Sequence, residues 1–364
     1  MVGSRLKSPH IRFYISDHGY GHASRSIAII RELQSQLNAQ ISVRTSVPAH
    51  FLKQSIPSCI VTNRTNDVGP TMDTESSAVN VDKTISEVSS FYSKSDSYIQ
   101  EEVAYCVNNS VDLILSDITP WVFRISDKIG AAGIGISNFT WYDIYSTIPG
   151  LEKVSNYMYD DYGLADSAIV LPFHSDMKVF NRRKYVPLIS RKIRRNRESM
   201  RNLMGIDANT LLIYIGSGLS INMIPKCLQQ IISDGYSILM SGNNHITGER
   251  IYHIPQNDTE TQDYIGMCDL VVTKSAYSTI SEAITAKIPL LVYRREGVNE
   301  DRYICDCIEK NRIGKIISWR NLSSGEWIKY IPDFISLKEN YQSCEKVFMM
   351  DGIDMCINHI KEFI

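Results

Sequence analysis

The sequence lacks a long apolar run, an apolar signal core at its N-terminus and any closely paired cysteine motif. The chain of 364 residues begins MVGSRLKSPHIRFYIS and continues directly into a short apolar segment, so neither a secretory leader nor a transmembrane segment is predicted. Its eight cysteines include no Cys-x-x-Cys pair and no Cys/His spacing typical of zinc. We therefore expect reduced, mostly buried thiols, no metal site and a cytoplasmic protein.

The chain also has little excess charge of either sign. Its net charge of −2 gives no general attraction to nucleic acid, and no nucleic-acid partner is predicted. One stretch differs, because residues 181–201 (NRRKYVPLISRKIRRNRESMR) are dense in Arg and Lys. This pattern is typical either of a solvated connector or of contact with an anionic ligand or lipid surface, which leaves peripheral membrane contact open.

The order of the apolar segments predicts an α/β fold. Short apolar runs alternate with segments of helical periodicity in the first half, and the same rhythm restarts near residue 211. Such alternation requires parallel sheets with helices on both faces. We predict two Rossmann-like domains facing across a cleft: an acceptor-side domain over residues 1–185 and a nucleotide-sugar-binding domain over residues 186–340. Residues 341–364 are predicted to form a C-terminal helix that packs back on the first domain.

The first polar segment that follows a predicted strand is SDHGYGHASR, residues 16–25. Its two glycines permit a tight turn, and the helix that it opens offers free backbone N–H groups. Imidazole is well suited to accept a proton near neutral pH, so His22 and His18 are candidate catalytic bases, with Tyr20 on the acceptor side. The alternative is that the histidines only cap backbone groups.

Two further strands of the first half end in polar residues. Asp117 lies in SDITP, and Asn138 and Trp141 lie in SNFTWY. Ligands of open α/β sheets bind beyond the carboxyl ends of the strands, so Asp117 is predicted to orient a catalytic histidine. Asn138 and Trp141 suit carbohydrate, whose hydroxyls need amide partners and whose C–H faces stack on rings. The alternatives are helix capping for Asp117 and core packing for the aromatic residue.

In the second half, the segment TKSAYSTISEA joins a strand to a helix. Tyr277, Ser278 and Thr279 lie where N–H groups point out of the helix start, which is a favourable site for a diphosphate. Glu282 lies one turn later, where a carboxylate can accept hydrogen bonds from ribose hydroxyls. The alternative for Glu282 is favourable placement of an acidic residue near a helix N-terminus.

The remaining donor-binding candidates follow two other strands of the second half. Glycines after one strand are predicted to wrap the diphosphate, and the polar residues of RREGVNEDR are predicted to bind sugar hydroxyls. These candidates are Gly216, Ser217, Gly218, Asn299, Glu300 and Asp301. The alternative for the charged segment is a helix start with local ion pairs.

Together these segments resemble the GT-B glycosyltransferases, and they are nearest to the glycosyltransferase-like domain of plant L-arabinokinases. The match includes DHGYGHASR, SDITP, SNFTWYDIY, VPLISRKIRR, YSTISEA and RREGVNEDR, and it runs from residue 11 to about residue 327. More distantly, the chain is similar to the bacterial transferase that adds N-acetylglucosamine to the peptidoglycan lipid precursor.

The resemblance implies inverting, metal-independent transfer of a hexosyl group from a nucleotide-diphosphate donor, commonly a UDP-sugar, to a glycan, lipid or small-molecule acceptor. No cofactor is implied, since the nucleotide sugar is a substrate, and the sequence contains no Asp-x-Asp tripeptide. The histidine of the family's loop matches His22 best by its Gly-His context, with His18 as the other candidate. The relative is fused to a sugar kinase that this sequence lacks, which favours a free-standing transferase. A nucleotide-sugar 2-epimerase and a non-catalytic sugar-nucleotide-binding protein remain open alternatives.

Overall fold

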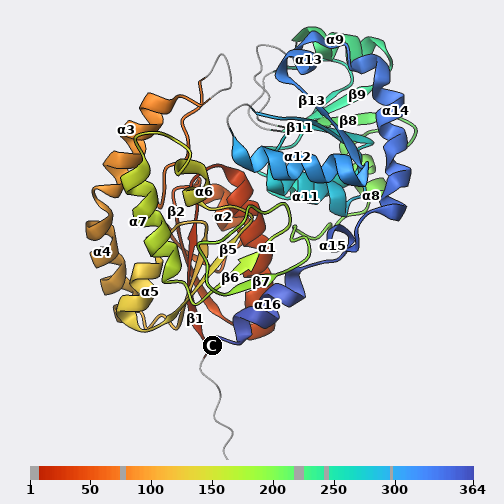
Figure 1. Cartoon of the computed structure of the whole chain (residues 1–364). Coiled ribbons are helices and arrows are strands. Elements are labelled where there is room, and N and C mark those ends of the chain that lie inside the picture. Colours follow the sequence, from red (N-terminus) through yellow and green to blue (C-terminus); the bar gives the residue numbers. More distant parts are fainter. Residues whose placement is uncertain (1–7, 74–78, 217–224, 242–245, 296–297) are drawn as a thin grey trace, which may run out of the picture. The chain divides into compact units, whose positions relative to one another are not determined.

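The computed structural model describes residues 8–73, 79–216, 225–241, 246–295 and 298–364. The chain divides into two compact units, the first comprising Met1–Ile189 and Asp351–Ile364 and the second Ser190–Met350. Each unit holds one sheet covered by its own helices (Figure 1). The prediction of two Rossmann-like α/β units is confirmed.

The first unit is built on a seven-stranded sheet in the order β3-β2-β1-β4-β5-β6-β7, in which neighbouring strands are parallel. The strands are β1 (His10–Ile15), β2 (Gln40–Thr45), β3 (Ile60–Asn63), β4 (Leu113–Asp117), β5 (Ala132–Ser137), β6 (Ser167–Val170) and β7 (Arg183–Tyr185). Strands β1 and β4 are buried at every position, as expected for central strands with helices on both faces.

Helices cover this sheet and carry the connections between its strands. They are α1 (Tyr20–Leu37), α2 (Ala49–Ser55), α3 (Val81–Tyr92), α4 (Ser95–Asn108), α5 (Phe123–Ile129), α6 (Trp141–Tyr145), α7 (Glu152–Gly163) and α16 (Ile353–Lys361). Helix α1 is buried at every position from His22 to Ile30, buries only Leu33 beyond that, and is capped by Asn38 in the left-handed region.

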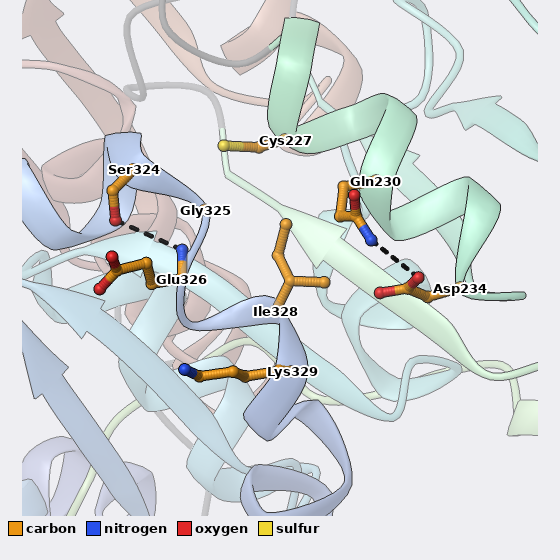
Figure 2. Close-up of a pocket in the computed structure, with 8 residues that line it drawn as sticks. All are labelled: Cys227, Gln230, Asp234, Ser324, Gly325, Glu326, Ile328 and Lys329. Carbon is orange, nitrogen blue, oxygen red and sulfur yellow. Dashed lines mark hydrogen bonds between the residues drawn. The ribbon is translucent and has the colours of Figure 1, made fainter.

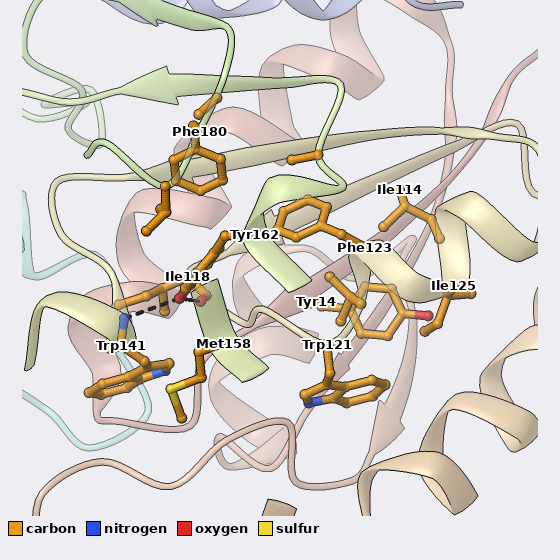
Figure 3. Packing of buried hydrophobic residues seen from close by; sticks show 14 of the residues in the cluster. Tyr14, Ile114, Ile118, Trp121, Phe123, Ile125, Trp141, Met158, Tyr162 and Phe180 are labelled. Carbon is orange, nitrogen blue, oxygen red and sulfur yellow. Dashed lines mark hydrogen bonds between the residues drawn. The ribbon is translucent and has the colours of Figure 1, made fainter. Parts of the chain in front are cut away.

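An aromatic core packs beneath the loops that follow β4 and β5. Figure 3 shows Trp121 after β4 and Trp141 at the start of α6 within the same cluster as Tyr14, Phe123 and Tyr162. All five side chains are buried, and the Trp121 and Trp141 indoles each donate a hydrogen bond to a neighbouring loop residue. The polar loops of this unit therefore rest on a close-packed support.

The second unit is built on a six-stranded parallel sheet in the order β10-β9-β8-β11-β12-β13. Its strands are β8 (Leu212–Ile215), β9 (Ser237–Met240), β10 (Ile251–His253), β11 (Leu270–Lys274), β12 (Leu290–Tyr293) and β13 (Gly314–Ile317). Its helices are α8 (Arg197–Met204), α9 (Pro225–Ser233), α10 (Thr261–Gly266), α11 (Tyr277–Thr285), α12 (Asn299–Asn311), α13 (Trp319–Ser324), η2 (Ile328–Tyr330), α14 (Ile331–Ser336), η3 (Leu337–Ser343) and α15 (Lys346–Met349).

Two arginines near the start of the second unit form ion pairs within that unit. Arg191 is 2% exposed and pairs with Glu282 at 2.8 Å. Arg201 is also buried and pairs with Asp269 at 3.0 Å. The solvated-connector interpretation of this basic segment is therefore wrong for these two arginines, because acidic partners more than sixty residues away in the sequence compensate for their burial.

The C-terminal segment is not the single helix that the sequence predicts. Helix α15 ends at Met349, Met350 is extended, and α16 begins at Ile353. The chain returns to the first unit here, and the Gly352 amide donates to the Leu188 carbonyl at 2.8 Å. A Cβ atom on Gly352 would lie 2.2 Å from the Pro187 carbonyl oxygen, so this close backbone approach interrupts the helix. Figure 1 shows α16 against α1.

Within the described parts of the chain, no helix is both long enough and apolar enough to cross a bilayer.

Candidate active site

The chemistry-bearing residues of the first unit gather where the order of its sheet reverses. From β1 the chain proceeds to β2 and β3 on one side, whereas β4 and the later strands lie on the other side. The carboxyl ends of β1 and β4 are therefore adjacent, with Ile15 opposite Asp117 in the strand register. A crevice at such a switch point is where open α/β sheets bind their ligands.

His22 and Asp117 meet across this switch point. The Nδ1 atom of His22 lies 2.7 Å from Oδ1 of Asp117, and the two residues are 7% and 0% exposed. The same Nδ1 atom also lies 2.9 Å from a terminal nitrogen of Arg25, which can only donate. Because Asp117 is the closer partner and an ionised carboxylate can only accept, we assign the proton of a neutral His22 to Nδ1. The Nε2 atom is then the one that can accept a proton, as a general base requires.

Arg25 holds the carboxylate of this pair in its ionised form. Its Nε and terminal nitrogen donate to the two Asp117 oxygens at 2.7 and 2.6 Å, and the Ser26 hydroxyl donates at 3.0 Å. Burial raises the pKa of Asp117, but the charges of Arg25 and His22 outweigh burial and lower that pKa to about 2. Asp117 is thus a permanent anion that orients His22 and can stabilise its imidazolium.

The turn that follows Asp117 is strained. Ile118 has φ of 70°, a left-handed conformation that is unfavourable for a β-branched residue. Its side chain is buried, and its carbonyl accepts a hydrogen bond from the Tyr162 hydroxyl. Strain of this kind persists only where the surrounding structure enforces it, and it is concentrated at functional sites.

The site contains one buried carboxylate that the sequence analysis missed. Asp67, from the loop after β3, accepts hydrogen bonds from Ser16 at 3.0 Å, Thr119 at 3.1 Å and the Trp141 indole at 3.0 Å. It thereby joins the loops that follow β1, β4 and β5. Burial, followed by the charge of Asp17, raises the pKa of Asp67 to about 6. An acidic residue in a long polar loop carries no sequence signal that distinguishes it from a solvated one.

His18 occupies a different environment from His22. Its ring lies edge-on to Trp141 with the ring centroids 5.6 Å apart, and a Cβ atom on Gly69 would lie 1.9 Å from its Nδ1 atom. The residue is exposed. Tyr20, the first residue of α1, is 50% exposed and stands edge-on to Phe51 of α2. Of the two histidines, the one that meets Asp117 is His22.

The other acceptor-side candidates are buried. Asn138 is 0% exposed and accepts a hydrogen bond from Arg25 at 2.7 Å. Trp141 is 1% exposed and stacks on Tyr145 at a centroid distance of 5.4 Å. Both side chains pack against residues of the site, Asn138 against Arg25 of α1 and Trp141 against His18.

The second unit has a corresponding switch point between β8 and β11. Gly216 follows β8 and donates its amide to Val272 of β11 at 3.0 Å. A Cβ atom on Gly216 would lie 2.9 Å from the Thr273 hydroxyl oxygen. A larger residue at this position would therefore crowd Thr273. The other two residues of the predicted diphosphate loop, Ser217 and Gly218, lie outside the described residues.

The start of α11 lies beside this switch point, because the helix follows β11 directly. Tyr277, Ser278 and Thr279 form its first turn, with the first two buried and the third half-buried. Glu282 is 4% exposed and accepts from Arg191 Nε at 2.9 Å. Burial raises the pKa of Glu282 although Arg191 opposes the shift. A ribose hydroxyl would have to share this carboxylate with Arg191.

The polar residues at the start of α12 have different environments. Asp301 is 0% exposed, and its carboxylate accepts from the Arg295 amide at 2.7 Å and from the Arg295 side chain at 2.6 and 3.1 Å. This is the local ion pair of the alternative interpretation, so Asp301 fixes the arginine and does not face solvent. Glu300 is 4.0 Å from Arg295 and partly exposed. The side chain of Asn299 lies outside the described part of the structure.

A hollow of about 380 Å³ lies elsewhere on the second unit, between α9 and the α13–η2 segment. Figure 2 shows Gln230 and Asp234 on one wall and Glu326 and Lys329 on the other. None of the residues predicted from the sequence lines this hollow, so it has no part in the site described above.

Comparison with solved structures identifies the architecture as the GT-B fold. The glycotransferase of kitacinnamycin matches with a TM-score of 0.70 and 12% identity over 98% of this chain and 100% of that one. UGT2 of Phytolacca americana, complexed with UDP-2fluoro-glucose and pterostilbene, matches with a TM-score of 0.64 and 13% identity over 98% and 100%. VinC in complex with dTDP matches with a TM-score of 0.61 and 9% identity over 97% and 99%. The GT-B prediction is confirmed at the level of the fold.

Comparison with curated proteins identifies a relative by sequence. L-arabinokinase of Arabidopsis thaliana is 26% identical over 363 residues, which cover 93% of this chain and 34% of the relative. The chain thus spans about a third of that protein, and the resemblance noted in the sequence motifs is confirmed. No family model matches the chain. The more distant resemblance to the peptidoglycan transferase stays a prediction.

Proposed function

We propose that this protein is a glycosyltransferase that transfers a hexosyl group from a nucleotide-diphosphate sugar to an acceptor hydroxyl with inversion and without a metal ion. The observation that carries the proposal is the hydrogen-bonded pair of His22 and Asp117 at the switch point of the first sheet. Its occurrence in a GT-B fold supports a transferase, and structural neighbours complexed with UDP-2fluoro-glucose and dTDP support UDP- and dTDP-sugars as the first donors to test.

In the proposed reaction, Nε2 of His22 removes the proton of the acceptor hydroxyl while the acceptor oxygen attacks the anomeric carbon. The new glycosidic bond forms as the bond from that carbon to the diphosphate oxygen breaks, and the leaving diphosphate takes the electron pair. Asp117 stabilises the resulting imidazolium, and Arg25 keeps Asp117 ionised and correctly oriented. The start of α11 and the loop at Gly216 would bind the diphosphate.

The test is a transfer assay with radiolabelled UDP- and dTDP-hexoses, a panel of phenolic, glycoside and lipid acceptors, and EDTA present throughout. Labelled glycoside together with released nucleoside diphosphate is the expected result, and NMR of the product would determine the anomeric configuration. An isomerised free sugar would instead indicate an epimerase, and nucleotide-sugar binding without turnover a non-catalytic protein. Retention of configuration or loss of activity in EDTA would refute the corresponding part of the proposal. A cytoplasmic location stays a prediction.

A further inference from the structure

Lys274 lies at the switch point of the second sheet but was not among the residues predicted from the sequence. It is the last residue of β11, opposite Tyr293 in the register with β12. Gly216, the residue that follows β8, adjoins the same strand end, because it contacts Val272 and Thr273. The Lys274 backbone thus stands at the carboxyl edge of the sheet, where a ligand of this fold is expected.

Among the residues that the structure describes, the ammonium group of Lys274 lacks the acidic partner that three arginines of this unit have. Arg191 pairs with Glu282, Arg201 with Asp269, and Arg295 with Asp301. By contrast, no hydrogen bond or ion pair joins the Lys274 ammonium to another residue within the described ranges, although its side chain is only partly exposed.

Burial and the neighbouring Arg295 make this position unfavourable for a cation in the free protein. Burial, followed by the charge of Arg295, lowers the pKa of Lys274, while Asp301 and Glu300 act in the opposite direction. Both Asp301 oxygens already accept from Arg295, whose terminal nitrogen also donates to the Ser275 carbonyl at 3.0 Å. Arg295 is therefore held in place and largely neutralised by Asp301. The N–H donors of Lys274 stay available to bind a ligand.

We propose that Lys274 binds the diphosphate of the donor nucleotide and stabilises the charge of the leaving nucleoside diphosphate. This inference rests on the proposed function. Lys274 is partly desolvated and lies beside a second cation, Arg295. A polyanion suits this position, since it supplies both hydrogen-bond acceptors and negative charge to the ammonium group. The unpartnered lysine is then a binding determinant that the free protein carries at a cost to its stability.

The experiment measures binding of five probes by calorimetry: UDP, dTDP, the two matching nucleosides and inorganic pyrophosphate. In Lys274→Met, affinity for the bound nucleoside diphosphate should fall by about 10- to 100-fold, as for loss of a charge-assisted hydrogen bond. Affinity for the nucleoside should stay unchanged, and pyrophosphate should no longer compete. Lys274→Arg should restore most of the affinity, because the charge is retained.

A matched control is Lys310→Met, which removes an exposed lysine at the end of α12. Helices of βα units run antiparallel to their strands, so this lysine lies at the opposite edge of the sheet, and its loss should leave nucleotide binding unchanged. Thermal unfolding of the unliganded proteins separates binding from folding. Lys274→Met should melt at the same temperature as the wild type or higher, whereas removing a structural lysine would lower the melting temperature.

Each outcome tests one part of the argument. If the wild type binds neither nucleoside diphosphate, the proposed donor chemistry is refuted, and the role of Lys274 with it. If the wild type binds but Lys274→Met binds equally well, only the role of Lys274 is refuted. A parallel loss of nucleoside and nucleoside diphosphate binding, or a lowered melting temperature, would show that the lysine maintains the fold and does not bind phosphate.

Discussion

Replacing Asp117 by Asn should impair both folding and catalysis, because the carboxylate neutralises one buried cation and orients His22. Asp117 accepts hydrogen bonds from Arg25, Ser26 and His22 while fully buried. An asparagine of the same shape has only one acceptor oxygen and no charge. Arg25, 3% exposed, would then be left as a buried cation without its anion.

The magnitude follows from the ion pair and from the pKa of Asp117. Removing one partner of a buried ion pair costs about 3–5 kcal/mol. The lowering of the pKa of Asp117 from 3.8 to about 2 corresponds to roughly 2–3 kcal/mol at neutral pH, which is consistent with that range. Because the folded pKa is depressed, this stability is present above the unfolded pKa and is lost as pH falls from 3.8 toward 2.

Urea unfolding at pH 7 measures this cost, with Asp127→Asn on the exposed surface of α5 as the matched control. The control should change stability by less than about 0.5 kcal/mol. In the double variant with Arg25→Met, the cost should be clearly smaller than the sum of the two single costs, because the unpaired cation is gone. A cost below about 1 kcal/mol for Asp117→Asn, or strict additivity in the double variant, would refute the argument.

Three further outcomes are expected. His22→Ala should lower turnover by about 100- to 10,000-fold with nearly constant nucleotide affinity, whereas His18→Ala should retain turnover; the reverse pattern in steady-state kinetics would move the base to His18. Glu282→Gln should weaken nucleotide binding by about 1–3 kcal/mol in calorimetry, and unchanged affinity would limit Glu282 to pairing with Arg191. The pKa of Asp67 is raised to about 6, so between about pH 4 and 6 the folded state holds a proton that the unfolded state has lost. This group's contribution to stability should therefore fall as pH rises from about 4 to 6. Unfolding curves of Asp67→Asn across that range should lack this decrease, and a pH dependence equal to that of the wild type would contradict the prediction.

The sequence predicted which polar segments follow the strands better than it predicted which side chains contact each other there. Alternating apolar and helical segments are local patterns, so parallel strands and the polar loops at their carboxyl ends could be recognised directly. The polar segments that contain His22 and Asp117 were predicted to approach each other for this reason, and Ile15 and Asp117 are opposite in the register. The final helix was predicted wrongly because the break before α16 depends on a close approach to Pro187 rather than on local propensity.

Only the tertiary structure decided which side chains contact each other and which already have hydrogen-bond or ion-pair partners within the protein. Asp67 reaches the loops after β1, β4 and β5 from a loop with no periodic pattern, and Arg191 reaches Glu282 across 91 residues. The same packing buries Asn138 and Asp301, and leaves the Lys274 ammonium without a partner among the described residues. Periodicity predicts which face of an element is buried, but pairing between polar groups far apart in sequence depends on the order of the strands and the paths of the loops, which are established only when the whole chain packs.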